Sequence, residues 1–389
     1  MKTKRGKDLA KTKISDDLRT NRAKLDHIPF DLIPDILKGL PAKSLARFLC
    51  LSKQCESIIR NRDFIKSYWI KSSTRPQTQS LIFTCEDKSK RKRHFFSVEI
   101  RGESSSYVAT YHMKCLSHPY KTVAPSVHGM ICYGPPRKIM VYNPSTRRSV
   151  TFPEIDSRRL DIYHYYLGYD PINEDYKVLC MTKCRSLDQL LEIRVLTLRE
   201  NGNSWRMIQD CPPDHSPESL DICINGVLYY EAYLDTDPFL QNKHQGVMSF
   251  DVRSEKFEHI RVPETAAEFT KMTRYEGKLA VMSFKPAGLS CTCRIDLWVL
   301  EDAAKHEWCN KVFALDLCIT DWYLQAFCLT DAGEFVFGPD TLSEPPFYVL
   351  YYDPKRNSFR KVYIEGITKR WGEAVISIFP GQVENLMFL

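Results

Sequence analysis

The sequence lacks several features that would place it in a membrane or outside the cell. Its longest apolar stretches, such as Ile222 to Tyr230, fall far short of the roughly 20 residues needed to cross a bilayer. Its first residues are basic and contain no apolar core, so they do not resemble a secretory signal. We therefore expect a protein of the cytoplasm, the nucleus or both, in a reducing compartment and with no membrane partner.

The sequence also lacks the common catalytic and metal-binding motifs. It contains no phosphate-cradling glycine loop, Gly-x-Ser-x-Gly elbow, His-Glu-x-x-His helix or Cys-x-x-Cys pair. The 14 cysteines are scattered through apolar segments, which favours free core thiols over disulfides or a zinc site. His112, His118 and His128 lie near Cys115 and Cys132 at irregular spacing. This spacing is typical of histidines that are hydrogen-bonded within the fold or face solvent, and not of metal ligands. We expect no catalytic residue, no metal and no cofactor, although residues assembled from distant strands leave no motif.

Positive charge is concentrated in two segments. Residues 1–26 contain nine Lys or Arg against four Asp or Glu, which leaves the rest of the chain nearly neutral. A solvated leader explains this tail more simply than nucleic-acid binding, so we expect no nucleic-acid partner. Residues 88–93 form a second basic run between two strand-like segments, where a charged hairpin tip is the simpler interpretation. Both runs are also compatible with nuclear import.

Residues 27–71 carry the pattern of short amphipathic helices. Ile33, Ile36, Leu37 and Leu40 fall at the i, i+3, i+4, i+7 spacing of one helix face. We expect Asp31 to cap this helix, because the proline that follows is tolerated in a first turn. Helices this short are marginal in isolation, which predicts that the module needs a partner.

Further signals divide this segment into four helices. Gly39 is expected to end the first helix and Pro41 to open the second. Ser52 is the expected N-cap of the third, with Cys55 three residues later, and Phe64 belongs to a fourth. Exposed aliphatic side chains on such a module suit burial in the groove of a partner. A helical cap that packs only on its own downstream domain is the alternative.

The same segment resembles an F-box of the plant type. The matching residues are 28–29, 31–32, 36–37, 40–45, 47–48, 51–53 and 58–59, followed by a similar linker at 72–76 and strand at 80–83. Cys55 stands where the family usually has tryptophan, which removes a large buried ring and predicts weaker docking.

This resemblance implies that the module binds a Skp-family adaptor, which is held in turn by a cullin that carries the ubiquitin-conjugating machinery. By position in the motif, nine residues are the expected contacts with that adaptor: Ile28, Pro29, Leu32, Ile36, Leu37, Leu40, Pro41, Leu45 and Phe48. Several of them must also fill the core of the module, and the sequence does not separate the two roles.

After the linker, short runs rich in Val, Ile, Tyr and Phe alternate with turn residues, which predicts an all-β domain. Asn143, Asp251 and Asp353 each follow an aromatic residue and precede a turn, so we expect a hairpin built on an Asx turn at each. Their spacing fits a unit of about 50 residues, as in kelch-like propeller blades, and six units fill the domain. No Gly-Gly pair occurs, so the repeat is degenerate and a β-sandwich stays open.

Together these patterns predict a basic leader (1–26), an F-box helical module (27–71), a linker (72–80) and an all-β domain (81–389) similar to plant F-box-associated domains. We expect a non-catalytic adaptor of a Skp–cullin–F-box ubiquitin ligase, whose β domain binds an unidentified target protein. Target-binding residues are unknown from sequence, and the candidate loops are 158–166, 211–220, 233–245 and 341–346. The alternatives are a stand-alone propeller enzyme and an F-box protein that acts outside a ligase.

Overall fold

The computed structural model describes residues 29–387 with internal gaps, and the chain divides into two compact units, residues 1–71 and 72–389. The gaps are 74–78, 88, 101–103, 118–125, 136–137, 156–159, 185–189, 199–202, 210–214, 235–243, 267–268, 286–292, 316–323, 340, 343–345, 368–373 and 380–381. No helix among the described residues is both long enough and apolar enough to span a bilayer.

The first unit is helical. Its elements are η1 (Phe30–Leu32), α2 (Ile33–Lys38), α3 (Ala42–Phe48), α4 (Lys53–Ile59) and α5 (Arg62–Ser73). Their buried side chains are Leu37, Ala42, Leu45, Ile59, Phe64 and Tyr68. The Tyr68 hydroxyl donates a hydrogen bond of 3.1 Å to the Leu40 carbonyl, so α5 is tied to the segment after α2.

The helix ends follow most, but not all, of the sequence signals. Gly39 is the C-cap of α2, and the Ser52 hydroxyl accepts a 3.0 Å hydrogen bond from the Cys55 N–H at the start of α4. The predicted Asp31 cap is wrong, because Asp31 lies inside the 3₁₀ turn that precedes α2. The sequence reading also missed Asn61, whose Oδ1 caps α5 by accepting from the Asp63 and Phe64 N–H groups.

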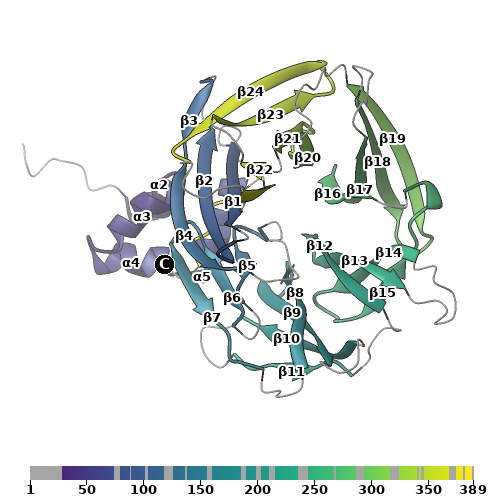
Figure 1. The fold of residues 1–389 in the computed structure, drawn as a ribbon. Helices are drawn as coiled ribbons and strands as arrows, with labels where there is room; N and C mark the ends of the chain where they lie inside the picture. The colour runs from purple at the N-terminus through teal and green to yellow at the C-terminus, as the bar shows by residue number, and fades with distance from the viewer. Residues whose placement is uncertain are drawn as a thin grey trace, which may run out of the picture. The chain divides into compact units, whose positions relative to one another are not determined.

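The second unit is a six-bladed β-propeller, with the sheets arranged around a central axis (Figure 1). Blade 1 contains β25 (Ala374–Phe379), β1 (Gln79–Asp87), β2 (Lys92–Ile100) and β4 (Thr110–Leu116). Blade 2 contains β5 (Ile131–Tyr133), β6 (Met140–Asn143) and β7 (Arg148–Thr151). Blade 3 contains β8 (Leu160–Asp170), β9 (Asp175–Cys184), β10 (Leu190–Thr197) and β11 (Arg206–Met207).

The remaining blades follow the same meander, with the first strand innermost. Blade 4 contains β12 (His215–Ile224), β13 (Val227–Leu234), β14 (His244–Asp251) and β15 (Phe257–Ile260). The turn η2 (Glu264–Ala266) leads to blade 5, which contains β16 (Lys271–Tyr275), β17 (Lys278–Lys285), β18 (Cys293–Asp302) and β19 (Glu307–Leu315). Blade 6 contains β20 (Leu324–Leu329), β21 (Phe335–Pro339), β23 (Phe347–Asp353) and β24 (Ser358–Glu365). The predicted six-unit propeller is confirmed, and the sandwich alternative is wrong.

Two strand exchanges join the first and last blades. β25 comes from the end of the chain but pairs antiparallel with β1, so it completes blade 1 from the inside. β3 (Ser106–Val108) comes from the connection between β2 and β4 but pairs in parallel with β24, so it adds an outer strand to blade 6. β22 (Thr341–Leu342), which follows β21, pairs with β25. The ring is thus closed by backbone hydrogen bonds at both its inner and its outer rim.

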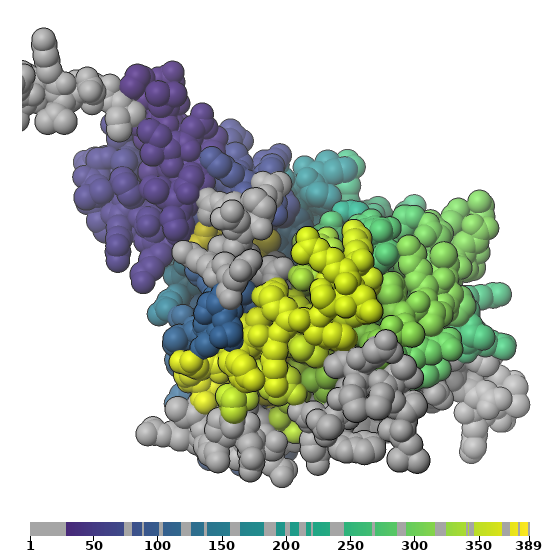
Figure 2. Space-filling view, turned by 90° about the horizontal axis from the view of Figure 1, so that it is seen from above, coloured from purple at the N-terminus to yellow at the C-terminus, as the bar shows by residue number. Residues whose placement is uncertain are grey.

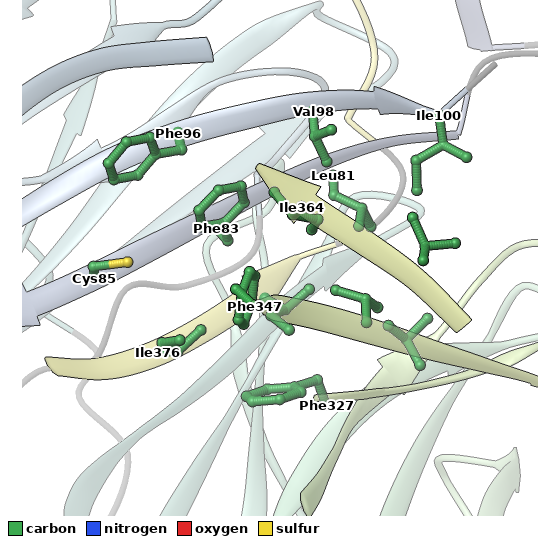
Figure 3. Close-up of a cluster of buried hydrophobic side chains, with 14 of the residues drawn as sticks. Leu81, Phe83, Cys85, Phe96, Val98, Ile100, Phe327, Phe347, Ile364 and Ile376 are labelled. Atoms are coloured by element: carbon green, nitrogen blue, oxygen red, sulfur yellow. The ribbon is translucent and has the colours of Figure 1, made fainter. Parts of the chain in front are cut away.

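Apolar clusters fill every junction between neighbouring blades. At the closing junction, Phe83 of β1 lies 5.1 Å from Phe96 of β2 and 5.6 Å from Phe347 of blade 6, measured between ring centroids (Figure 3). Blades 5 and 6 lie side by side in the same way, green and yellow in the space-filling view (Figure 2). Because each cluster draws on two blades, no blade is expected to be stable by itself.

All three predicted Asx turns are confirmed. The side-chain oxygens of Asn143, Asp251 and Asp353 accept hydrogen bonds from backbone N–H groups two or three residues later. Asp87, Asp170 and Asp302 form the same turn, so every blade carries one. In each turn the fourth residue after the Asn or Asp has a positive φ: Arg91, Arg147, Glu174, Glu255, His306 and Asn357.

The turn of blade 2 also holds the C-terminal segment. The Asn143 side chain is fully buried, and its Nδ2 donates to the carbonyls of Asn385 and Met387 at 3.0 and 2.7 Å. Asn385 Nδ2 donates in turn to the His128 carbonyl, and Leu386 is completely buried. Gly129 is required here, because a side chain at its φ of 83° would collide with the Val383 carbonyl. Asn143 therefore stabilises a turn and a chain end together.

We predict that Asn143→Ala lowers the free energy of unfolding of the full-length protein by about 2–4 kcal/mol, because it removes four hydrogen bonds from a buried site. Asp353→Ala is the matched control, since it removes an Asx turn that holds no other segment, and it should cost about 1 kcal/mol. Urea denaturation followed by tryptophan fluorescence measures both. Equal losses in the two variants would contradict the double role of Asn143.

Candidate partner-docking surface

An exposed apolar row begins the helical unit. Phe30 in η1 and Leu32 at its end are 58% and 47% exposed, and Ile36 in α2 is 48% exposed. Leu32 and Ile36 are four residues apart, so their side chains lie on the same helical face. Pro29, before η1, is exposed as well. Four apolar side chains within eight residues leave a surface that their own unit does not cover.

The structure sorts the nine predicted adaptor contacts by exposure. Pro29, Leu32, Ile36 and Pro41 are exposed, and Leu40 and Phe48 are half-buried. Leu37 and Leu45 are 2% and 0% exposed, so both fill the core of the unit. Ile28 lies outside the described residues. The resemblance had grouped these residues by their position in the motif, and that position does not separate core from surface: in α2 the exposed Ile36 directly precedes the buried Leu37.

The exposure of three further residues bears on the docking surface of this unit. Phe30 and Leu51 were not among the nine predicted contacts, yet they are 58% and 69% exposed. Phe30 could have been found from its place directly beside Pro29 and Leu32. Cys55, where the resemblance leads one to expect tryptophan, is half-buried on α4.

The propeller offers a second kind of surface. In blades 3 to 6, strands 1 and 2, and strands 3 and 4, are joined at one end of the blade, which we call the turn end, because neighbouring strands run antiparallel. At this end the Asn225 side chain donates to the Gly277 carbonyl of the next blade, so neighbouring turns are bonded together. The opposite end of the blades, the loop end, carries the connections that contain parts of the candidate loops 158–166, 211–220, 233–245 and 341–346. Most of 158–166 and 211–220 belongs to β8 and β12, so the prediction of loops there is wrong. Residues 158–159, 211–214, 235–243 and 343–345 lie outside the described residues.

The carboxylates and thiols described in the propeller have structural roles. Asp170 anchors an Asx turn, and Glu174 occupies the positive-φ position of that turn. Burial raises the pKa of the Cys85 thiol to about 12, which keeps it protonated and unreactive. Within the described part of the chain, no group of three or more His, Cys, Asp or Glu is placed to hold a metal ion.

His112 lies on β4 and His128 in the turn before β5, and each packs against a tyrosine of another strand, whereas His118 lies outside the described residues. His112 Nε2 lies 2.7 Å from the Ser97 hydroxyl, and its Nδ1 lies 3.1 Å from the Tyr142 hydroxyl. Burial, aided by the charge of Arg147, lowers the pKa of His112 to about 4. His128 packs on the Tyr169 ring, and burial lowers its pKa to about 4 as well. Both rings therefore favour the neutral form in the folded protein.

These two histidines predict acid sensitivity. Between pH 6.5 and about 4 the unfolded chain binds protons that the folded chain does not, so the free energy of unfolding falls as the pH falls. Each histidine contributes a slope of up to about 1.4 kcal/mol per pH unit in this range. His112→Gln should flatten the dependence of the urea midpoint on pH between 7 and 5. An unchanged slope in that variant would contradict the assignment, whatever its absolute stability.

Comparison with known proteins agrees with both units. A model of the F-box domain matches residues 25–67, and a model of the F-box associated beta propeller domain matches residues 80–385. F-box protein At2g21930 of Arabidopsis thaliana is 51% identical, over 97% of this chain and 98% of its own length. Two further Arabidopsis thaliana relatives, putative F-box protein At4g38870 and F-box protein At1g30790, are 42% and 34% identical, over 93% and 95% of this chain and 88% and 100% of their own lengths. The chain therefore belongs to the plant F-box proteins that carry an F-box-associated β-propeller.

Proposed function

We propose that this protein is the substrate-recognition subunit of a Skp–cullin–F-box ubiquitin ligase. The helical unit binds a Skp-family adaptor, through which a cullin is recruited, and the propeller binds the target protein. The protein supplies two binding surfaces and no catalytic group. The membership in the F-box family supports this role in general terms.

The exposed row of Pro29, Phe30, Leu32 and Ile36 is the observation that carries the proposal. An apolar row of this kind is unfavourable in water and becomes favourable when a partner covers it. Its helical geometry, with anchors spaced four residues apart, suits insertion into a groove lined by helices. Leu37 and Leu45 act indirectly, because they hold α2 and α3 in place from the core.

We assign the target protein to the loop end of the propeller. At the turn end, the Asx turns of blades 2 to 6 bind their own backbone, and Asn143 and Asn385 fix the C-terminal segment there. Those polar groups are therefore already used within the chain. Connections at the loop end are longer, and long connections on a rigid scaffold commonly carry binding residues. We place the protein in the cytoplasm or nucleus, which the basic runs in the sequence support.

We predict that Ile36→Asp in the full-length chain weakens binding to a purified Skp-family adaptor at least about tenfold, because a carboxylate would have to be buried in an apolar contact. Gln54→Asp adds the same charge at an exposed position of α4 and should bind normally. Isothermal titration calorimetry measures both. Normal binding by the Ile36 variant, or equal loss in both variants, would refute the docking surface.

A core substitution separates docking from folding. Leu45→Ala should reduce adaptor binding by destabilising the helical unit, by about 2–5 kcal/mol, and should also increase proteolysis of that unit. Ile36→Asp should leave the proteolysis pattern unchanged. If a Skp-family adaptor binds but no cullin joins the complex in a reconstitution, the protein acts outside a ligase and the proposed function fails.

A further inference from the structure

The outer edges of most blades are short or covered. β7 and β15 span four residues each and β11 spans two, while β3 pairs with the outer edge of β24. Such edges leave few backbone N–H and C=O groups available to another chain, which is a common protection against unwanted strand pairing. β19 of blade 5 is different, because its nine residues, Glu307–Leu315, contain no proline.

β19 lies at the outer rim of the propeller (Figure 1). Within the part of the chain that the structure describes, no strand pairs with its outer edge. Val312, in the middle of the strand, is 52% exposed. A long edge with an exposed β-branched residue is a template for another strand.

We propose that β19 pairs with β19 of a second copy of this chain, in antiparallel orientation, to form a dimer. An antiparallel pair of identical strands has a two-fold axis, so each residue of one copy has a fixed partner in the other. In the proposed dimer the two-fold axis passes between the Asn310 residues of the two copies. In this register Trp308 of one copy faces Val312 of the other, and this contact occurs twice.

Charge complementarity selects this register. Glu307 and Lys311 form no ion pair within the described part of the chain, and Lys311 Nζ lies 4.7 Å from the centroid of the Tyr275 ring and donates to the Tyr275 hydroxyl at 3.4 Å. With the axis at Asn310, Glu307 of one copy lies diagonally across from Lys311 of the other, within reach of long side chains. The two contacts between Trp308 and Val312 and the two ion pairs between Glu307 and Lys311 therefore favour the same register.

The neighbouring registers are less favourable. With the axis at Lys311, two ammonium groups would face each other directly, which is destabilising. With the axis at Cys309, Val312 would meet His306, whose φ of 56° ends the strand, so the pairing would be shorter.

β4 of blade 1 is the other long outer edge, with seven residues. It contains Lys114 but no carboxylate, so pairing with a second copy would gain no ion pair. β4 therefore lacks the self-complementarity of β19, and Lys114 offers a matched control position on an equivalent edge.

The first test measures the dimer dissociation constant of the full-length protein by sedimentation equilibrium. Lys311→Glu should raise it about tenfold, because two attractive contacts become repulsive. The double variant Glu307→Lys with Lys311→Glu should restore dimerisation, although it still lacks the contact between Lys311 and Tyr275. Lys114→Glu on β4 should leave the constant unchanged. A failure of the double variant to recover would overturn the ion-pair register.

The second test uses a disulfide cross-link to identify the residue that lies on the two-fold axis. Asn310→Cys in a Cys309→Ser background should give a disulfide-linked dimer under mild oxidation, because residues on a two-fold axis face their own copies. The wild-type chain, with Cys309 as its thiol on this strand, should cross-link far less. A cross-link through Cys309 would overturn the register. A full-length protein that stays monomeric at every concentration would overturn the dimer and leave this edge to a strand from another protein.

Discussion

The pairing of β25 with β1 is the constraint on which the rest of the propeller depends. Each blade packs its apolar faces on the blade before and the blade after it, so the stack has exposed faces at both ends until it becomes a ring. β25 removes that exposure by carrying the last part of the chain into the first blade. β3 acts at the outer rim in the opposite sense, by carrying an early segment to the last blade. The two exchanges hold one junction from both sides.

Much of this fold could be predicted from local signals. The Asx turns at Asn143, Asp251 and Asp353 were identifiable because an Asn or Asp between an aromatic strand and a turn satisfies its own backbone, wherever it occurs. Their regular spacing predicted repeated blades, and repetition predicted a ring. Gly39 and Ser52 marked helix ends for a similar reason, because capping chemistry involves only a few adjacent residues.

Features that depend on contacts between distant residues could not be predicted. Nothing local to Ser106–Val108 indicates that it pairs with β24, and Asn143 gave no sign that it also binds the C-terminal segment. The prediction at Asp31 was wrong because its short side chain suits a cap, while the 3₁₀ turn around it moved the N-cap by one residue to Leu32. In the candidate docking surface, sequence did not predict the division between the buried Leu37 and the exposed Ile36. That division depends on how α2 packs against its neighbours.

The exchange at β25 also bears on the order in which the molecule forms. β1 is made early during synthesis, while the strand that completes its sheet is made after all the other blades. Until then the side chains around Phe83 that later meet blade 6 have no partner, and the nascent domain exposes an apolar surface that chaperones recognise. A chain that stops before Ala374 would keep that surface permanently. Closure of the ring therefore distinguishes finished chains from unfinished ones by the apolar area that each exposes.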